Sequence, residues 1–155
     1  MKKILVVYYS RTGHTKEIAK EIAEELKADI DEIIDLKNRK GMKGYITGGK
    51  DAIEKKLTEI KFSKEPKNYN LVIVGTPNWA KTMPPAVRTY LERNKNIKQI
   101  AFFCTYGNYL GKIFQTIEEV SKKPLATLSI RFKSFSDKAE PFYENKLEKF
   151  CEELK

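Results

Sequence analysis

The sequence predicts an α/β fold in which a doubly wound, five-stranded parallel sheet carries helices on both faces. Two observations support this class. Five short segments are rich in β-branched and aromatic residues, as strands of a buried sheet are. The segments between them carry apolar residues at a helical period, so strands and helices alternate along the chain. The length of 155 residues suits one domain, and we expect residues 1–155 to form it.

Three of the expected strands are continuous apolar runs, which is typical of strands buried on both faces. They cover Ile4–Tyr9, Leu71–Gly75 and Ile100–Cys104. Asp29–Leu36 alternates more weakly and carries four acidic residues, as an edge strand does. Leu125–Phe132 alternates regularly and is expected to be the last strand.

Four segments have the apolar spacing of amphipathic helices. The first covers residues 15–28, the second follows Pro84 and Pro85, the third covers residues 113–120, and the last begins near Pro141. Residues 37–61 are interrupted by four glycines, and only residues 52–60 show a helical period there. We therefore interpret residues 37–61 as a long crossover with one short helix, not as a second domain.

The net charge is +9, from 30 basic and 21 acidic residues, and residues 37–67 hold ten basic residues against four acidic ones. This excess indicates either a solvated lysine-rich surface or a basic face for an acidic partner. The sequence has no zinc-ligand spacing and no basic region leading into heptads, so we expect no nucleic-acid partner. The longest apolar run has six residues, so we expect no membrane span and no signal peptide. Cys104 and Cys151 are expected to be reduced thiols of a cytoplasmic protein, and no metal site is expected.

Ligands of such sheets bind beyond the carboxyl ends of the strands, which directs attention to three loops. The first, Ser10–Thr15, brings three hydroxyls and one glycine to the start of a helix. Backbone N–H groups and the helix dipole at that position favour a phosphate, although an ordinary Ser/Thr cap is the simpler alternative. The loop matches neither the Walker A motif nor the Gly-x-Gly-x-x-Gly motif.

The second loop, Thr76–Lys81, contains the single tryptophan, Trp79. We expect Pro77 and Asn78 to form a type II turn, with Asn78 at positive φ. A flat aromatic side chain at this edge could cover a flat ligand or could belong to the core. The third loop, Thr105–Gly111, adds two tyrosines, either of which could cover a ring.

Together these motifs resemble those of the flavodoxin family, which binds flavin mononucleotide (FMN). The likeness rests on Ser10-x-Thr12-Gly13-x-Thr15 after an apolar strand, on Gly75-Thr-Pro-x-Trp79, and on Phe-Phe-x-Thr105 before a glycine-containing loop. The resemblance implies the sheet order 2-1-3-4-5. It also implies that FMN contacts Ser10, Arg11, Thr12, Gly13, His14, Thr15, Thr76, Pro77, Asn78, Trp79, Ala80, Thr105, Tyr106, Gly107, Asn108 and Tyr109.

No set of residues resembles an acid–base catalyst, so we assign no catalytic residue and expect FMN to carry the chemistry. His14, the only histidine, is interpreted as a positional loop residue. A receiver-type phosphorylation site and a Cys-x5-Arg phosphatase loop both lack their required residues.

Three functions remain. The leading one is electron transfer between redox partner proteins. The alternative is an FMN-dependent NAD(P)H oxidoreductase that acts on quinones or other small acceptors, which the long glycine-rich crossover favours by resemblance. The third is a binding module without flavin. The chain is expected to be a monomer or a homodimer.

Overall fold

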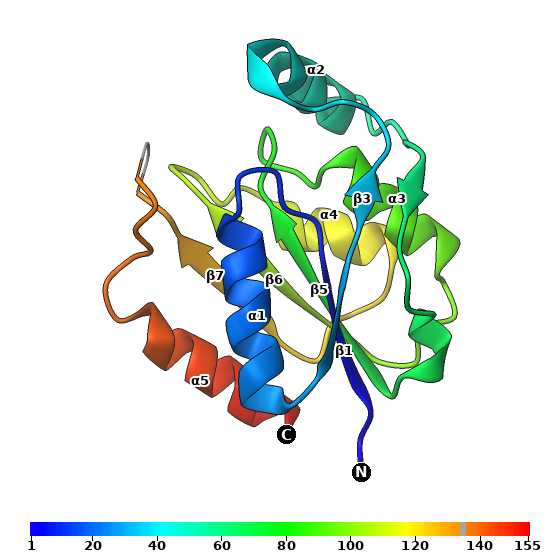
Figure 1. Cartoon of the computed structure of the whole chain (residues 1–155), viewed down its shortest axis with the longest axis vertical. Coiled ribbons are helices and arrows are strands. Elements are labelled where there is room, and N and C mark those ends of the chain that lie inside the picture. The colour runs from blue at the N-terminus through cyan, green and yellow to red at the C-terminus, as the bar shows by residue number, and fades with distance from the viewer. Residues whose placement is uncertain (134–135) are drawn as a thin grey trace.

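The computed structural model describes residues 1–133 and 136–155, and its centre is a parallel sheet of five strands. The spatial order is β2 (Asp29–Glu32), β1 (Ile4–Tyr8), β5 (Leu71–Pro77), β6 (Ile100–Tyr106) and β7 (Thr127–Arg131) (Figure 1). This is the order 2-1-3-4-5, so the predicted doubly wound sheet is confirmed. The chain reverses its direction of winding at β1, which places the switch point between β1 and β5.

Helices cover both faces of the sheet, as predicted (Figure 1). α1 (His14–Leu26) and α5 (Tyr143–Leu154) pack on one face, against inward side chains such as Val6. α3 (Pro85–Arg93) and α4 (Ile113–Val120) pack on the other face, against side chains such as Leu5. Because successive side chains of a strand point to opposite faces, a fully apolar strand supplies both cores.

The crossover between β2 and β5 contains most of the irregular structure. It runs through β3 (Ile34–Asp35), α2 (Gly41–Ile53), β4 (Ile60–Lys61) and the short 3₁₀ helix η1 (Pro66–Asn68). β3 and β4 pair antiparallel. Figure 1 shows α2 beyond the carboxyl edge of the sheet, outside both helical layers.

The prediction of a helix over residues 52–60 was wrong, because α2 starts at Gly41 and ends at Ile53. All four glycines lie within this helix, and two of them allow close approaches. A Cβ on Gly44 would stand 2.2 Å from the backbone of Arg39, and one on Gly48 would stand 2.7 Å from the ring of Trp79. Tertiary contacts therefore outweigh the low helix propensity of glycine in this segment.

A buried ion cluster ties α2 to β3. The Arg39 guanidinium donates to Asp35 at 3.0 Å and to Asp51 on α2 at 2.6 Å, and all three side chains are almost fully buried. Thr58 donates to the second oxygen of Asp35 at 2.8 Å. Since each carboxylate is paired or hydrogen-bonded, the cluster avoids an uncompensated buried charge. It fixes the position of α2 over the carboxyl edge.

None of the helices in residues 1–133 and 136–155 is both long enough and apolar enough to span a bilayer.

Candidate functional site

Three loops meet at the carboxyl edge of the sheet, where they surround a pocket of about 220 Å³ that we call the loop pocket. The first loop follows β1, the second follows β5, and the third follows β6. Its lining residues come from all three loops, from α2 and from the segment after β7: Arg11, Thr12, His14, Thr15, Tyr45, Pro77, Asn78, Trp79, Thr105, Tyr106, Gly107, Phe132 and Lys133.

The first loop ends in a helix N-terminus that opens toward this pocket. Gly13 caps α1 at φ 105°, a conformation that glycine adopts without strain, and its N–H donates to Ser10 Oγ at 3.0 Å. The first N–H groups of a helix have no partner within it, and they lie at the positive end of the helix dipole. Together with the exposed Thr12 side chain, they form a donor-rich wall suited to an anion.

Two contacts hold this wall in place. Thr15 and Thr105 share a buried hydrogen bond of 2.8 Å that joins the first loop to the third. The His14 ring stacks on Phe132 with 4.1 Å between centroids, and its Nε2 lies 3.2 Å from Asp137 Oδ1. His14 is therefore held between two partners.

Arg11 connects the first loop to α2. Its Nε donates to the carbonyl oxygen of Arg39 and its Nη2 to that of Gly41, both at 2.9 Å. Its guanidinium also lies 5.7 Å from the ring centroid of Tyr45. The side chain thus serves as a tether for the start of α2 while it leaves a positive charge beside the pocket.

The second loop differs from its predicted form. Ala80 and Lys81 are the residues at positive φ, at 50° and 65°, and Asn78 is not. They form a tight turn closed by reciprocal backbone hydrogen bonds between Trp79 and Thr82, of 2.9 and 3.0 Å. The prediction of a type II turn at Pro77–Asn78 was therefore wrong.

The reason is that Asn78 is bound to the third loop. Its N–H donates to Thr105 O at 3.1 Å, which prolongs the pairing of β5 with β6. Its side-chain Nδ2 donates to the carbonyl oxygens of Tyr109 and Leu110, at 2.6 and 2.8 Å. Asn78 Oδ1 is buried and accepts no hydrogen bond from the described part of the chain.

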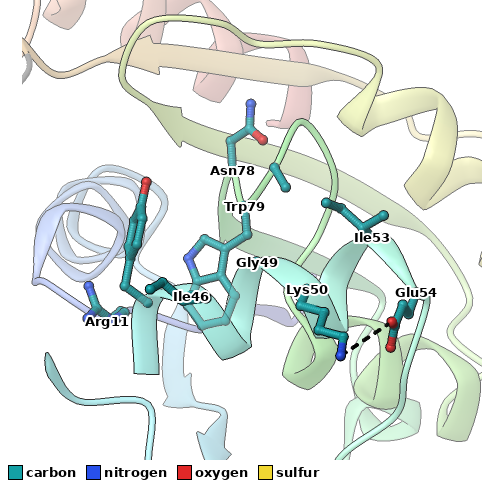
Figure 2. A pocket seen from close by; sticks show the side chains of 10 residues that line it. Arg11, Ile46, Gly49, Lys50, Ile53, Glu54, Asn78 and Trp79 are labelled. Carbon is teal, nitrogen blue, oxygen red and sulfur yellow. Dashed lines mark ion pairs between the residues drawn. The ribbon is translucent and has the colours of Figure 1, made fainter. Parts of the chain in front are cut away.

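Trp79 lines both the loop pocket and a second pocket. Its ring packs edge-on against Tyr9, with centroids 5.5 Å apart and planes at 77°, and it lies against Gly48 of α2. Burial raises the pKa of Tyr9 to about 12, with a smaller contribution from Asp35, so the phenol stays neutral. The second pocket, here the α2 pocket, has a volume of about 450 Å³. Its lining residues are Arg11, Tyr45, Ile46, Gly49, Lys50, Ile53, Glu54, Asn78, Trp79 and Ala80 (Figure 2).

The structure brings many of the sequence-predicted site residues to the loop pocket, but not all of them. Ser10, Gly13, Thr76, Ala80, Asn108 and Tyr109 do not line it. Ala80 lines the α2 pocket instead, and Tyr109 is exposed with Lys81 Nζ 5.6 Å from its ring centroid. Of the two tyrosines in the third loop, Tyr106 is the one that reaches the pocket.

Sequence reasoning missed three lining residues: Tyr45, Phe132 and Lys133. Phe132 and Lys133 directly follow β7, so the rule that ligands bind beyond carboxyl strand ends could have found them. Tyr45 lies in α2, whose position depends on the buried ion cluster and could not be read from local periodicity.

Burial strongly raises the pKa of the Cys104 thiol, which therefore stays protonated. Within residues 1–133 and 136–155, no three His, Cys, Asp or Glu side chains are grouped so as to hold a metal ion.

Comparison with known proteins gives the family. Residues 3–130 match the family model described as Flavodoxin. The chain belongs to the flavodoxin family. A flavoprotein from Lactobacillus acidophilus, solved in complex with FMN, has a similar structure with a TM-score of 0.74 and 24% identity over 83% of this chain and 93% of that one.

More distant members share the fold of this flavodoxin-family chain. Flavodoxin 2 from Bacillus cereus matches with a TM-score of 0.60 and 19% identity over 98% of this chain and 97% of its own. A WrbA-like flavodoxin from Agrobacterium tumefaciens matches with a TM-score of 0.60 and 13% identity over 98% and 96% of the two chains.

Proposed function

We propose that this chain binds FMN in the loop pocket and carries electrons between redox partners. The observation that carries the proposal is that all three candidate loops line one pocket, with an anion-suited helix N-terminus and aromatic side chains both on its wall. FMN combines a phosphate with a flat aromatic ring system and so requires both kinds of wall. When bound, it supplies the redox chemistry by taking up one or two electrons.

The residues present fit this cofactor. The start of α1 and Thr12 supply donors for a phosphate dianion. Asn78 lines the pocket and is fixed there by its hydrogen bonds to the third loop. Trp79 and Tyr106 supply aromatic surface. Ser10 and Gly13 act behind this wall by shaping the first loop.

Thr12→Val tests the phosphate assignment. A hydroxyl that donates to a phosphate contributes about 1.5–3 kcal/mol, so its loss should raise the FMN dissociation constant by more than about tenfold. Quenching of flavin fluorescence measures this constant. Thr127→Val is a matched control, because Thr127 is exposed at the start of β7, on the opposite edge of the sheet. Equal affinities of the Thr12 variant and the wild type would contradict the assignment.

Stepwise reduction with dithionite tests the electron-transfer role. A protein that carries single electrons should pass through a stable one-electron-reduced stage with long-wavelength absorbance. Direct bleaching to the two-electron state would contradict a single-electron carrier.

A second candidate function is an FMN-dependent NAD(P)H oxidoreductase that acts on quinones or other small acceptors. The α2 pocket favours it, because a protein that only exchanges electrons with other proteins needs no small-molecule pocket beside its cofactor. Steady-state oxidation of NAD(P)H with a quinone distinguishes the two functions. We further propose a cytoplasmic location, supported by the two buried, unpaired cysteines, which suit a reducing compartment.

A further inference from the structure

We infer that the α2 pocket is a second ligand site, which takes a planar aromatic anion beside the proposed FMN site. The inference rests on the proposed function only for the identity of the neighbouring cofactor. The site itself follows from the shape, the apolar wall and the charge of the α2 pocket.

The wall of the α2 pocket is apolar where a helix on the surface should be polar. Tyr45, Ile46 and Ile53 of α2 are 67%, 63% and 65% exposed, although a surface helix ordinarily turns such residues toward the core. Together with Trp79 and Ala80 they line a cavity of about 450 Å³, within the range of small-molecule sites (Figure 2). An apolar concavity of this kind, in a chain with 33% charged residues, indicates a ligand.

The charges at the rim favour an anion. Arg11 and Lys50 are positive, and Glu54 is the only acidic lining residue. Lys50 Nζ lies 4.0 Å from Glu54 Oε1, whereas Lys56 Nζ lies 2.9 Å from Glu54 Oε2. The hydrogen bond from Lys56 lowers the pKa of Glu54, so this carboxylate is ionised and pairs with both lysines. With two cations against one carboxylate that Lys56 also contacts, the rim carries a net positive charge, which favours a sulfonate, carboxylate or phosphate group.

Two neighbouring glycines of α2 have different surroundings at this wall. Gly48 lets the Trp79 ring approach, since a Cβ would stand 2.7 Å from Cζ3. At Gly49 nothing beyond its own helix lies within 4 Å of the position of a Cβ. Gly49 thus leaves open space at the pocket wall (Figure 2).

The α2 pocket adjoins the proposed FMN site, because Arg11, Tyr45, Asn78 and Trp79 line both pockets. Among planar aromatic anions, quinones with an acidic substituent are therefore the class that fits the site chemically. Fully reduced FMN would pass two electrons and two protons to such a quinone. FMN would return to its oxidised form and the quinone would leave as hydroquinone. The two electrons come from the redox partner or from NAD(P)H, the donors of the two candidate functions.

Isothermal titration of the FMN-loaded protein with anthraquinone-2-sulfonate tests the site. Gly49→Leu fills the open space and should weaken binding of the sulfonate by at least about tenfold, while Gly49→Ala should change it less than about threefold. Both variants should bind FMN like the wild type. If Gly49→Leu binds the sulfonate as tightly as the wild type, or if it loses FMN as well, the inference is overturned.

A comparison of an anionic with a neutral anthraquinone tests the role of charge. The wild type should bind anthraquinone-2-sulfonate more tightly than the neutral 2-(hydroxymethyl)anthraquinone, and Lys50→Gln should reduce that preference by about threefold or more. An unchanged preference would contradict the assignment of an anionic ligand.

Failure of the proposed function remains separable from failure of this inference. A wild type that takes up no FMN would end the proposed function. The sulfonate titration would then run on the flavin-free protein, with the fluorescence of Trp79, the single tryptophan, as readout. In that experiment the same loss on Gly49→Leu supports the α2 pocket, and its absence overturns it.

Discussion

Asp51→Asn should destabilise the protein by about 2 kcal/mol at pH 7, because it removes the negative charge that accepts two charge-assisted hydrogen bonds in the buried cluster that holds α2. Asp51 accepts from Arg39 at 2.6 Å and from Lys37 at 2.9 Å, and its side chain is 6% exposed. Arg39 keeps its contact with Asp35 in the variant, so the loss should stay below the 3–5 kcal/mol of a fully unpaired buried charge.

The pKa of Asp51 expresses the same contacts as a dependence of stability on pH. The hydrogen bond from Arg39, aided by Lys37, lowers this pKa from 3.8 to about 2. A difference of that size between the unfolded and folded states corresponds to about 2 kcal/mol of stability. Because the folded pKa is the lower one, this stability is present above about pH 4 and is lost as the pH falls toward 2. The difference between wild type and variant should therefore shrink over that range.

Urea unfolding at several pH values measures the effect with two probes. Far-UV circular dichroism follows the whole fold, and Trp79 fluorescence reports on the contact with Gly48 of α2. Glu54→Gln is the matched control: it makes the same chemical change at the end of the same helix, but on an exposed side chain, and should leave stability unchanged. A difference below about 0.5 kcal/mol at pH 7 for Asp51→Asn, or one that does not depend on pH, would refute the reasoning.

Three further substitutions, one of them with a matched control, test local packing in α2, in the second loop and in α3. Gly48→Ala should displace the Trp79 ring, shift its fluorescence emission and lower the free energy of unfolding by about 1–3 kcal/mol. Its control, Gly49→Ala, should leave that free energy unchanged or raise it. Equal stabilities of the two variants would contradict the close approach of Gly48 to Trp79. Lys81→Gly should raise the free energy of unfolding by up to about 1 kcal/mol, because a φ of 65° is unfavourable for lysine. A melting temperature below that of the wild type would contradict strain at this turn. Arg88→Met should raise the free energy of unfolding by about 1 kcal/mol, because Arg88 is only 6% exposed and its Nε and Nη2 have no hydrogen-bond partner among the described residues. A lower free energy of unfolding in urea would show that the guanidinium does have partners.

The sheet could be predicted because each central strand can be recognised from its own residues alone. Runs such as Leu71–Gly75 are buried on both faces, so each position must be apolar and the segment stands out without any knowledge of its neighbours. The three loops could be located for the same reason, since they follow these strands. The internal geometry of the loops could not, because Asn78 takes its conformation from carbonyl groups of the third loop, some thirty residues away in the chain.

α2 escaped prediction for a different physical reason. Amphipathic periodicity identifies a helix only when one face is buried against the core, and α2 packs outside both helical layers. Its position depends on the buried ion pair between Arg39 and Asp51, and no local sequence pattern predicts that pair. The residues of the site that depend on α2, Tyr45 above all, were missed with it.

Gly41, the first residue of α2, has a φ of 71°, which glycine adopts without strain. The three glycines in the interior of the helix can be explained one by one, and Gly49 bears on function. Glycine inside a helix costs about 1 kcal/mol relative to alanine, so each requires a compensating contact. Gly44 has one in the backbone of Arg39, and Gly48 has one in the ring of Trp79. Gly49 has no such contact beyond its own helix, and alanine there would meet no obstacle. Gly49 leaves open space in the α2 pocket. A ligand bound in that space would explain why glycine stands here despite its low helix propensity. A Gly49→Ala protein that is more stable and still binds the aromatic anion nearly as well would show that a methyl group fits. The loss of binding on Gly49→Leu would then show how much larger a side chain must be to close the site.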